Sequence, residues 1–202
     1  MHSSSLLGAV ACSALALGTL AHAGVVVTPS QTLWNQRVVN GGNSVGTETF
    51  DTLSGYYPTT ASGVVGDVTW TASASPSGMS ASNGILSTSD AFATLTFTFS
   101  KGVRAVAGNI FGTDSLGNVV PSIIDVTVSD GTTYEGFATS ASEFIGFYSS
   151  TANITSLSIT VAAPTPGTGV RASIDNLYLA VPSPGAAALV ALAGLLAKRR
   201  RV

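Results

Sequence analysis

Apolar and polar residues alternate along several short segments in the middle of this chain. Residues 94–99 are the clearest case, because an apolar side chain follows each of three threonines. The same period of two recurs at residues 124–128 and 157–161. Since successive side chains of a β-strand point to opposite faces, the pattern predicts strands with one face in a core and the other in solvent.

Turn-forming residues separate these segments, and weaker strand patterns lie between them. Ser129-Asp130-Gly131 predicts a hairpin turn whose glycine takes a positive φ. The further predicted strands are residues 33–39, 47–53, 64–72, 104–111, 132–137, 144–148 and 172–181. Between the two ends of the chain we find no sustained helical period and no internal repeat. About ten short strands with Gly-, Ser- and Pro-rich turns predict an all-β fold, a single β-sandwich or jelly roll over residues 24–180.

The N-terminal end has the pattern of a signal peptide. An apolar run covers residues 6–20 and is followed by Ala21-His22-Ala23, a small-x-small cleavage site. We therefore expect residues 1–23 to form a signal helix that signal peptidase removes before Gly24. A buried N-terminal helix and a lipoprotein signal ending at Cys12 are the weaker alternatives.

The C-terminal end has three parts. It begins with Val181-Pro182-Ser183-Pro184, which interrupts regular structure, and residues 185–197 are then all small or apolar. The basic residues that follow are Lys198, Arg199, Arg200 and Arg201. The apolar stretch rises about 20 Å as a helix, short of a hydrocarbon core of roughly 30 Å, so a permanent span is marginal. A short apolar helix with a basic stop suits transient retention in a membrane.

This tripartite tail, residues 181–202, resembles the PEP-CTERM sorting domain of Gram-negative bacteria. Pro182-Ser183-Pro184 stands where that domain usually has Pro-Glu-Pro. The resemblance implies that an exosortase-type enzyme processes the tail while the inner membrane holds the protein transiently. It also implies a final location at the cell surface, in the outer envelope or in the extracellular matrix. A plain C-terminal membrane anchor is the alternative.

The body resembles the jelly-roll modules that often precede such tails. The matching segments are residues 49–53, 129–133, 144–147 and 174–177. In related galactose-binding-like sandwiches, acids on the first and last strands can hold a structural calcium ion. Asp51 and Asp175 occupy corresponding places, and with backbone carbonyls and water they could supply the roughly six to eight oxygens that calcium takes. The alternative is that both carboxylates cap strand ends or turns.

Charge and reactive side chains narrow the function further. Residues 24–181 contain four bases and ten acids, a formal charge of −6, so they lack the basic surface that nucleic acid requires. Both histidines and the single cysteine lie in the predicted signal peptide. Their removal excludes Ser-His-Asp and Cys-His catalysis and zinc sites of the usual ligand types. Residues 42–46 match the G-x-S-x-G pattern of a nucleophile elbow, but without a histidine base we interpret them as a loop.

Carbohydrate binding is the function that we expect. Sugar sites combine flat aromatic rings with hydrogen-bonding side chains in a shallow concavity. Tyr56 and Tyr57 lie in a predicted loop and are the favoured ligand contacts, whereas Trp70 falls in an alternating strand and is expected in the core. The other aromatic candidates are Trp34, Tyr134 and Tyr148. The sequence thus predicts an exported, non-catalytic surface or matrix protein whose partner is an exopolysaccharide.

Two other functions stay open. A small carboxylate-dependent hydrolase of extracellular glycan needs only two placed acids, and the glutamates available are Glu48, Glu135 and Glu143. An ice-binding protein would need several stacked rows of hydroxyls. The threonines of residues 94–98 supply one row, and a chain without repeats is expected to supply no second one. We interpret these threonines as the solvent side of a strand.

Overall fold

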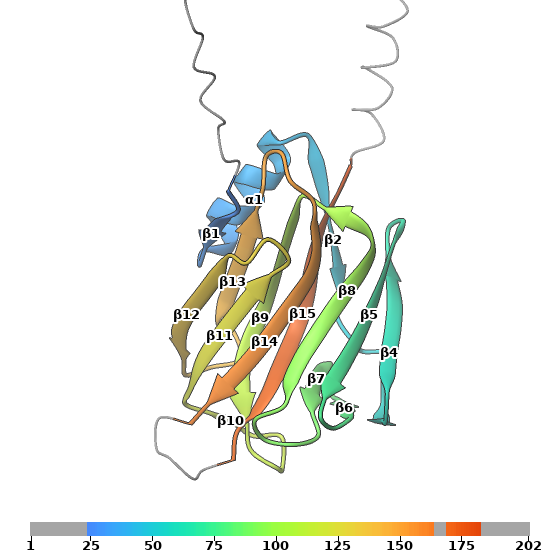
Figure 1. The fold of residues 1–202 in the computed structure, drawn as a ribbon, viewed down its shortest axis with the longest axis vertical. Helices are drawn as coiled ribbons and strands as arrows, with labels where there is room; N and C mark the ends of the chain where they lie inside the picture. Colours follow the sequence, from blue (N-terminus) through green and yellow to red (C-terminus); the bar gives the residue numbers. More distant parts are fainter. Residues whose placement is uncertain (1–23, 164–168, 183–202) are drawn as a thin grey trace, which may run out of the picture.

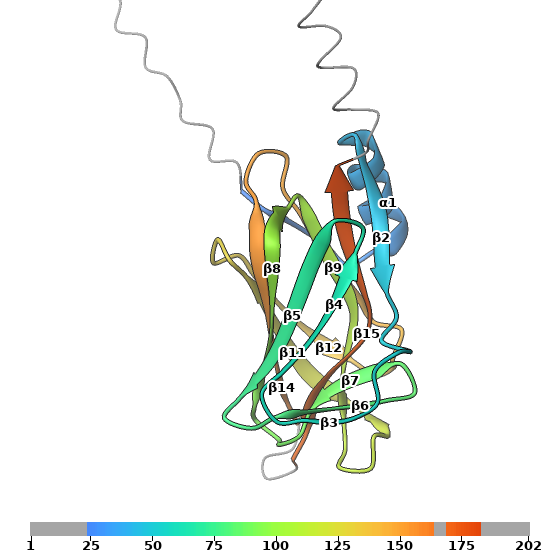
Figure 2. The same cartoon turned by 90° about the vertical axis from the view of Figure 1, so that its right-hand side faces the viewer.

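Two antiparallel β-sheets pack face to face in the computed structural model, which describes residues 24–163 and 169–182 (Figures 1 and 2). One sheet has nine strands and the other has six. The prediction of an all-β sandwich is therefore confirmed. The predicted cleavage residues Ala21 and Ala23 lie outside the described residues, as do the tail residues from Ser183 onward.

The nine-stranded sheet is organised around β15 (Arg171–Pro182), which pairs with β9, β7 and β2. The order across the sheet is β1-β13-β9-β15-β7-β6-β3, with β10 beside β9 and β2 beside β15. The bounds of these strands are β1 (Val26–Thr28), β2 (Asn43–Glu48), β3 (Gly55–Tyr57), β6 (Met79–Ser82), β7 (Ile85–Thr88), β9 (Ala105–Thr113), β10 (Val119–Val120) and β13 (Phe144–Tyr148).

The six-stranded sheet contains the clearest alternating segments of the sequence. Its strands, in order across the sheet, are β12 (Thr133–Ala138), β11 (Ser122–Val128), β14 (Ile154–Ala162), β8 (Thr94–Val103), β5 (Val68–Ser75) and β4 (Thr60–Val65). In β8, Leu95 and Phe97 are fully buried while the threonines face outward, as predicted. The predicted hairpin between β11 and β12 is also confirmed, with Gly131 at a φ of 86°.

The core lies between the two sheets and is centred on an aromatic cluster. Phe50, Trp70 and Phe97 are fully buried, with ring centroids 5.5 to 6.1 Å apart. A buried indole N–H needs an acceptor, and Trp70 Nε1 donates to Glu48 Oε2 at 3.0 Å. The other oxygen of Glu48 accepts the backbone N–H of Phe50 at 2.9 Å. The prediction that Trp70 belongs to the core is confirmed.

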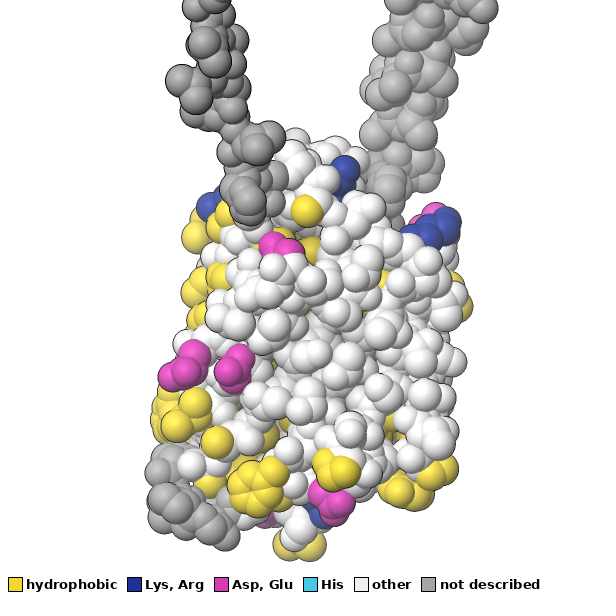
Figure 3. Space-filling view, viewed as in Figure 1, with side chains coloured by type: hydrophobic (Ala, Val, Ile, Leu, Met, Phe, Trp, Pro, Cys, Tyr) yellow, Lys and Arg dark blue, Asp and Glu magenta, His cyan; other side chains and the backbone are white. Residues whose placement is uncertain are grey.

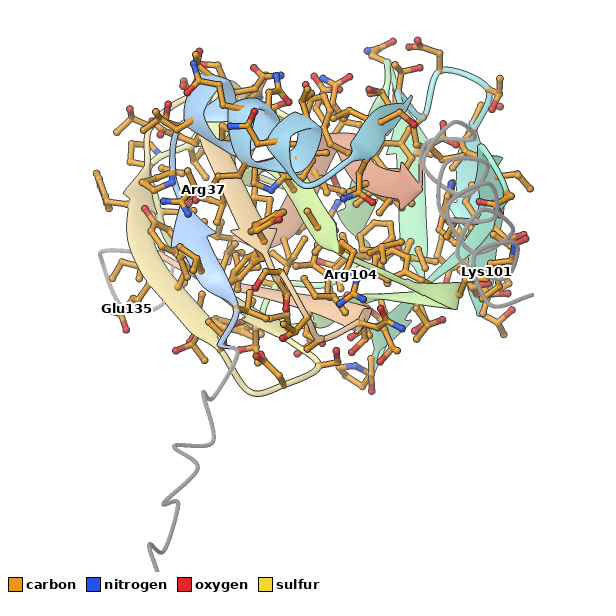
Figure 4. The ribbon with its side chains drawn as sticks, turned by 90° about the horizontal axis from the view of Figure 1, so that it is seen from above. Arg37, Lys101, Arg104 and Glu135 are labelled. Carbon is orange, nitrogen blue, oxygen red and sulfur yellow. The ribbon has the colours of Figure 1, made fainter. Side chains whose placement is uncertain are left out.

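Residues 33–39, predicted as a strand, form most of helix α1 (Gln31–Asn40) instead. Ser30 caps the helix, since its hydroxyl accepts the N–H of Leu33 at 3.5 Å. Trp34 and Val38 lie one turn apart and are fully buried, which is a helical spacing and not an alternation. Their partners on the outer face of the nine-stranded sheet are Ala105, Ala107, Phe144 and Ala180. Figure 4, seen from above, shows α1 lying across this face.

The described residues form fifteen strands, where the sequence predicted about ten. The unpredicted strands are short ones of two to four residues: β1, β3, β6, β7 and β10. The segment predicted as one strand at residues 64–72 belongs to the β4–β5 hairpin, which turns at Gly66 with a φ of 61°. Residues 43–46, predicted as part of a loop, belong to β2. Since α1 precedes β2, the order there is helix to strand, opposite to a nucleophile elbow.

The last strand extends through the beginning of the predicted sorting motif. Val181 pairs with Ser44 and Pro182 pairs with Asn43, so β15 ends at Pro182. The described fold thus begins and ends at the same end of the sandwich, next to α1 (Figure 1). Among the described residues, no helix has the length and apolar content that crossing a bilayer requires.

Candidate ligand-binding face

The outer face of the nine-stranded sheet is covered by α1 at one end and hollowed at the other. Figure 2 shows β3, β6 and β7 at the end away from α1. The hollow there has a volume of about 200 Å³ and is walled on one side by residues 114–117, the loop after β9. Its remaining lining side chains are Ser80, Ser82, Asn83, Ile85, Ser87, Thr113 and Arg171. We call this the sheet hollow.

A chain of three hydroxyl groups supports the floor of the sheet hollow, because Ser87 and Thr113 line the hollow and Ser173 joins them from beneath. Ser173 is fully buried, and its Oγ lies 2.8 Å from Ser87 Oγ and 2.8 Å from Thr113 Oγ1. Strand register brings them together, because Ser173 on β15 pairs with Ser87 on β7 while β9 runs along its other side. Hydrogen-bonded hydroxyls in a shielded site polarise one another, so the floor is a fixed polar surface.

The rim of the hollow carries polar groups that are not used within the fold. Among the described residues, no side-chain hydrogen bond involves Ser80, Ser82 or Asn83. Asn83 and Gly84 form the two-residue turn between β6 and β7, with φ values of 53° and 77°. Asn-Gly is the dipeptide that favours this tight hairpin turn. That dipeptide is therefore the sequence signal that could have identified the β6–β7 hairpin and its rim.

The loop wall is held in place by its own polar contacts. Asp114 accepts the N–H groups of Leu116 and Asn118 at 2.8 and 2.9 Å and the Asn118 amide at 3.0 Å. The hydrogen bonds from Asn118 hold the pKa of Asp114 below its ordinary range. Arg171 Nη1 donates to the carbonyl of Ser115 at 3.3 Å, which uses one of its five N–H donors. Arg171 is the cation of the hollow and can donate to a ligand.

Tyr56 is the exposed aromatic residue beside the hollow. Its side chain is 64% exposed, and it pairs in register with Ser80 across the β3–β6 ladder. Tyr57 pairs with the buried Met79, packs partly against the core, and accepts the N–H of Ser54 at 3.3 Å. The predicted loop thus contains β3, whose alternation separates the two tyrosines. The structure places Tyr56 next to the lining residue Ser80, outside the lining of the hollow itself, and turns Tyr57 toward the core.

The other aromatic candidates are not available as platforms. Trp34 and Trp70 have no exposed surface, and Trp34 Nε1 donates to the carbonyl of Phe147 at 3.0 Å. Tyr134 packs against the main core, and Tyr148 packs against the cluster under α1. Composition could not separate these residues from Tyr56, because the separation depends on which face of its strand or helix each one occupies.

Asp51 and Asp175 lie near one another at the edge of the same face. Burial raises the pKa of Asp175 above its ordinary value of 3.8, and the negative charge of Asp51 raises it further. Asp175 is paired with Ile85, a residue of the hollow, and Asp51 Oδ1 lies close to Gly84. A divalent cation between the carboxylates would relieve their repulsion, and such oxygens suit calcium. The described residues contain no group of three or more acid, histidine or cysteine side chains placed to hold a metal.

The glutamates are not gathered in a cleft. Glu48 is occupied by Trp70 and Phe50 inside the fold. Glu135 is exposed on the other sheet, where it pairs in register with Asp125 (Figure 4 labels Glu135). Glu143 is half-buried directly before β13. None of the three lines the sheet hollow, so the described structure does not build a two-carboxylate site there.

No family model matches this chain, and no curated protein matches it in sequence. Two solved structures of family 29 carbohydrate-binding modules are similar to it. One, a point mutant used to probe ligand recognition, has 12% identity and a TM-score of 0.37, over 68% of this chain and 86% of that one. The other has 12% identity and a TM-score of 0.36, over 68% of this chain and 89% of that one. Similarity at this level assigns no function, which has to be argued from the surface itself.

Proposed function

We propose that the protein is an exported, non-catalytic component of the cell surface or extracellular matrix that binds a polysaccharide in the sheet hollow. The observation that carries this proposal is the exposed ring of Tyr56 beside the unpaired polar rim at Ser80, Ser82 and Asn83. A sugar ring has an apolar C–H face and hydroxyl groups along its edge. An aromatic ring can therefore stack on its face while serine and asparagine side chains exchange hydrogen bonds with its edge.

Charge around the hollow favours a neutral polymer. Arg171 is the cation among the residues that line it, while Asp114 lines it and Asp51 and Asp175 lie at the edge of the same face. The described bases Arg37, Lys101 and Arg104 are labelled in Figure 4, which views the opposite end of the sandwich. An acidic polysaccharide would meet net negative charge at the hollow, so neutral hydroxyl-rich sugars are the better match.

Binding is tested with the full chain and a set of neutral oligosaccharides, by titration calorimetry. Loss of the stacking platform in Tyr56→Ala is expected to weaken binding at least tenfold, or about 1.4 kcal/mol. The matched control is Phe92→Ala, which removes a ring that is 71% exposed on the loop between β7 and β8, outside the hollow. Tyr57→Phe is a second control, since that ring faces the core. Equal binding by the wild type and Tyr56→Ala would discard the proposed site.

Export and sorting are supported by the two ends of the sequence. Intact mass of the protein recovered from its native envelope tests both steps. We expect a chain that starts at Gly24 after signal peptidase and ends near Val181 or Pro182 after the exosortase-type enzyme. A chain cut after Pro182 would keep the whole of β15, whose last pair is Pro182 with Asn43. A mass that retains Lys198 to Val202 would make the tail an ordinary membrane anchor.

The alternative function, a glycan hydrolase, predicts that the protein releases reducing sugar and that this depends on its glutamates. Glu135 and Glu143 come from separate parts of the surface, and neither lines the sheet hollow. We therefore expect no release of reducing sugar from neutral glycans, and no difference on Glu135→Gln or Glu143→Gln. Turnover that disappears in either variant would replace the binding function with a catalytic one.

A further inference from the structure

The outer face of the six-stranded sheet carries hydroxyl side chains on every strand. The alternation that buries Leu157 and Leu95 leaves serine and threonine as their outward neighbours. Figure 3 views this face and shows mostly uncharged polar surface across its centre, with acidic side chains toward one side. The acids Asp125 and Glu135 are on β11 and β12 at that edge of the sheet.

Strand register aligns these side chains in two rows that run across the strands. The first row crosses all six strands and consists of Thr133, Thr127, Ser158, Thr96, Ser73 and Thr60. The second row crosses four strands and consists of Ser156, Thr98, Thr71 and Ser62. We call the two rows together the hydroxyl array. The expectation that a chain without repeats supplies only one row is wrong, because pairing stacks unlike strands as well as repeated ones.

The array repeats in two dimensions. Neighbouring strands of a sheet lie about 4.8 Å apart, and outward residues along one strand are about 6.8 Å apart. Twist rotates each strand by roughly 20 to 25° relative to the next, so the flattest part spans neighbouring strands only. β14, β8 and β5 form the centre of the array and contribute three hydroxyls to each row.

Most hydroxyl groups of the array are available to a ligand. Within the described residues, the contacts that the array makes with itself are Thr96 Oγ1 to Ser158 Oγ at 3.3 Å and Thr98 Oγ1 to the Thr71 carbonyl at 3.4 Å. Both distances are long for hydroxyl hydrogen bonds. Threonine adds a methyl group beside each hydroxyl, so the surface alternates hydrogen-bonding and water-repelling groups.

The chemistry of the array rejects most kinds of partner. Its two rows contain no charged side chain, so they offer nothing to phosphates or anionic lipid headgroups. They contain no aromatic ring on which a sugar could stack, and none of the aromatic or arginine side chains that enrich protein interfaces. The remaining kind of partner is an uncharged solid whose surface is a two-dimensional lattice of hydrogen-bonding oxygens. Such a surface is neutral and repeats in two dimensions, as the array does.

We propose that the hydroxyl array binds the surface of ice. The strand ladders hold the hydroxyl groups in a fixed lattice, so they can take positions of the ice lattice with little further ordering. The threonine methyl groups exclude mobile water between those positions. This site is independent of the sheet hollow, since the two lie on opposite outer faces of the sandwich.

The test uses the full chain in assays of thermal hysteresis and of ice recrystallisation. The wild type is expected to inhibit recrystallisation, and Thr98→Tyr to require at least a tenfold higher concentration, because the ring holds the face off the ice plane. Thr71→Tyr, on the paired strand, is expected to act in the same way. The matched control is Thr47→Tyr, which changes an exposed strand threonine of β2 in the other sheet and leaves the activity unchanged.

Three results would overturn the proposal. The wild type could leave recrystallisation unaffected, or Thr98→Tyr and Thr47→Tyr could act alike while both keep the wild-type melting midpoint. Thr98→Tyr could also reduce adsorption to an insoluble polysaccharide with no effect on ice, which would assign the array to a polysaccharide surface. Tyr56→Ala separates the two proposals, since it should weaken sugar binding and leave ice activity intact.

Discussion

The two outer faces of the sandwich are both rich in serine and threonine, yet they offer different surfaces. On the nine-stranded sheet, α1 covers one end and the loop at residues 114–117 walls the other, so the polar groups lie in a recess with Tyr56 beside it. On the six-stranded sheet the hydroxyls stand in register across the strands. Similar composition thus gives a walled recess on one face and aligned rows of hydroxyl groups on the other.

Loss of the contact between α1 and the nine-stranded sheet should have the largest effect on stability. Trp34→Ala empties the contact between α1 and the nine-stranded sheet and leaves the carbonyl of Phe147 without its indole donor. A buried tryptophan truncated to alanine typically costs about 3 to 5 kcal/mol of unfolding free energy. Urea denaturation of the variant measures this loss.

Leu33→Ala is the matched control for that experiment. Leu33 is the neighbouring helix residue and is 54% exposed, so the substitution should change the unfolding free energy by no more than about 0.5 kcal/mol. Similar losses in the two variants would mean that α1 does not cover the sheet through Trp34. The two faces would then differ less than the structure indicates.

The wall of the sheet hollow should matter for sugar affinity more than for stability. Arg171→Met keeps the apolar stem but removes the N–H donors that fix the Ser115 carbonyl and face the hollow. We expect a loss of about tenfold in affinity for neutral oligosaccharides, equivalent to about 1.4 kcal/mol, by calorimetry. Arg104→Met is the control, because Arg104 makes the same kind of bond, to the Ala152 carbonyl at 3.2 Å, outside the hollow. A loss of affinity in both variants would contradict a specific role of Arg171.

The strands of the six-stranded sheet were largely predictable from the sequence, and parts of the nine-stranded sheet were not. A strand with one face in solvent shows strict alternation, as β8 and β14 do. Strands of the other sheet are covered on both faces for part of their length, as in β9, where eight of nine residues are buried. Alternation is lost in such a strand. β6 and β7 do alternate, but each has only four residues, which is too short for the period to stand out in the sequence.

The candidate sites depended on information that a single sequence does not carry. Ser30 as a helix cap and the spacing of Trp34 and Val38 are local signals that identify α1 once a helix is considered. By contrast, the hydroxyl chain under the sheet hollow joins residues from three strands, namely Ser87, Ser173 and Thr113. Both rows of the hydroxyl array likewise join residues that are far apart in the chain. Register between distant strands decides these sites, and no local pattern encodes it.

The smallest predicted effect concerns the like-charge pairs of the two faces. Asp175 has a raised pKa because it is partly buried and lies near Asp51, whereas Asp125 and Glu135 are exposed on the other face. A carboxyl group whose pKa is raised in the folded state destabilises the fold when it is ionised. The free energy of unfolding therefore falls as pH rises above 3.8, the ordinary pKa. In the presence of chelator, Asp175→Asn should therefore raise the melting midpoint at pH 7 by up to about 3 °C. The difference should vanish at pH 3.

If Asp51 and Asp175 hold calcium together, added calcium should reverse the effect of Asp175→Asn on the melting midpoint. A ligand that binds only the folded state raises the midpoint, so added calcium should stabilise the wild type more than Asp175→Asn. Asp125→Asn is the matched control on the other face, and its midpoint should change little and should not depend on calcium. Equal melting midpoints of the wild type with calcium and with chelator would show that Asp51 and Asp175 hold no calcium and only repel one another. A drop in midpoint for Asp175→Asn under chelator would show that the carboxylate stabilises the fold by itself, against the direction of its pKa.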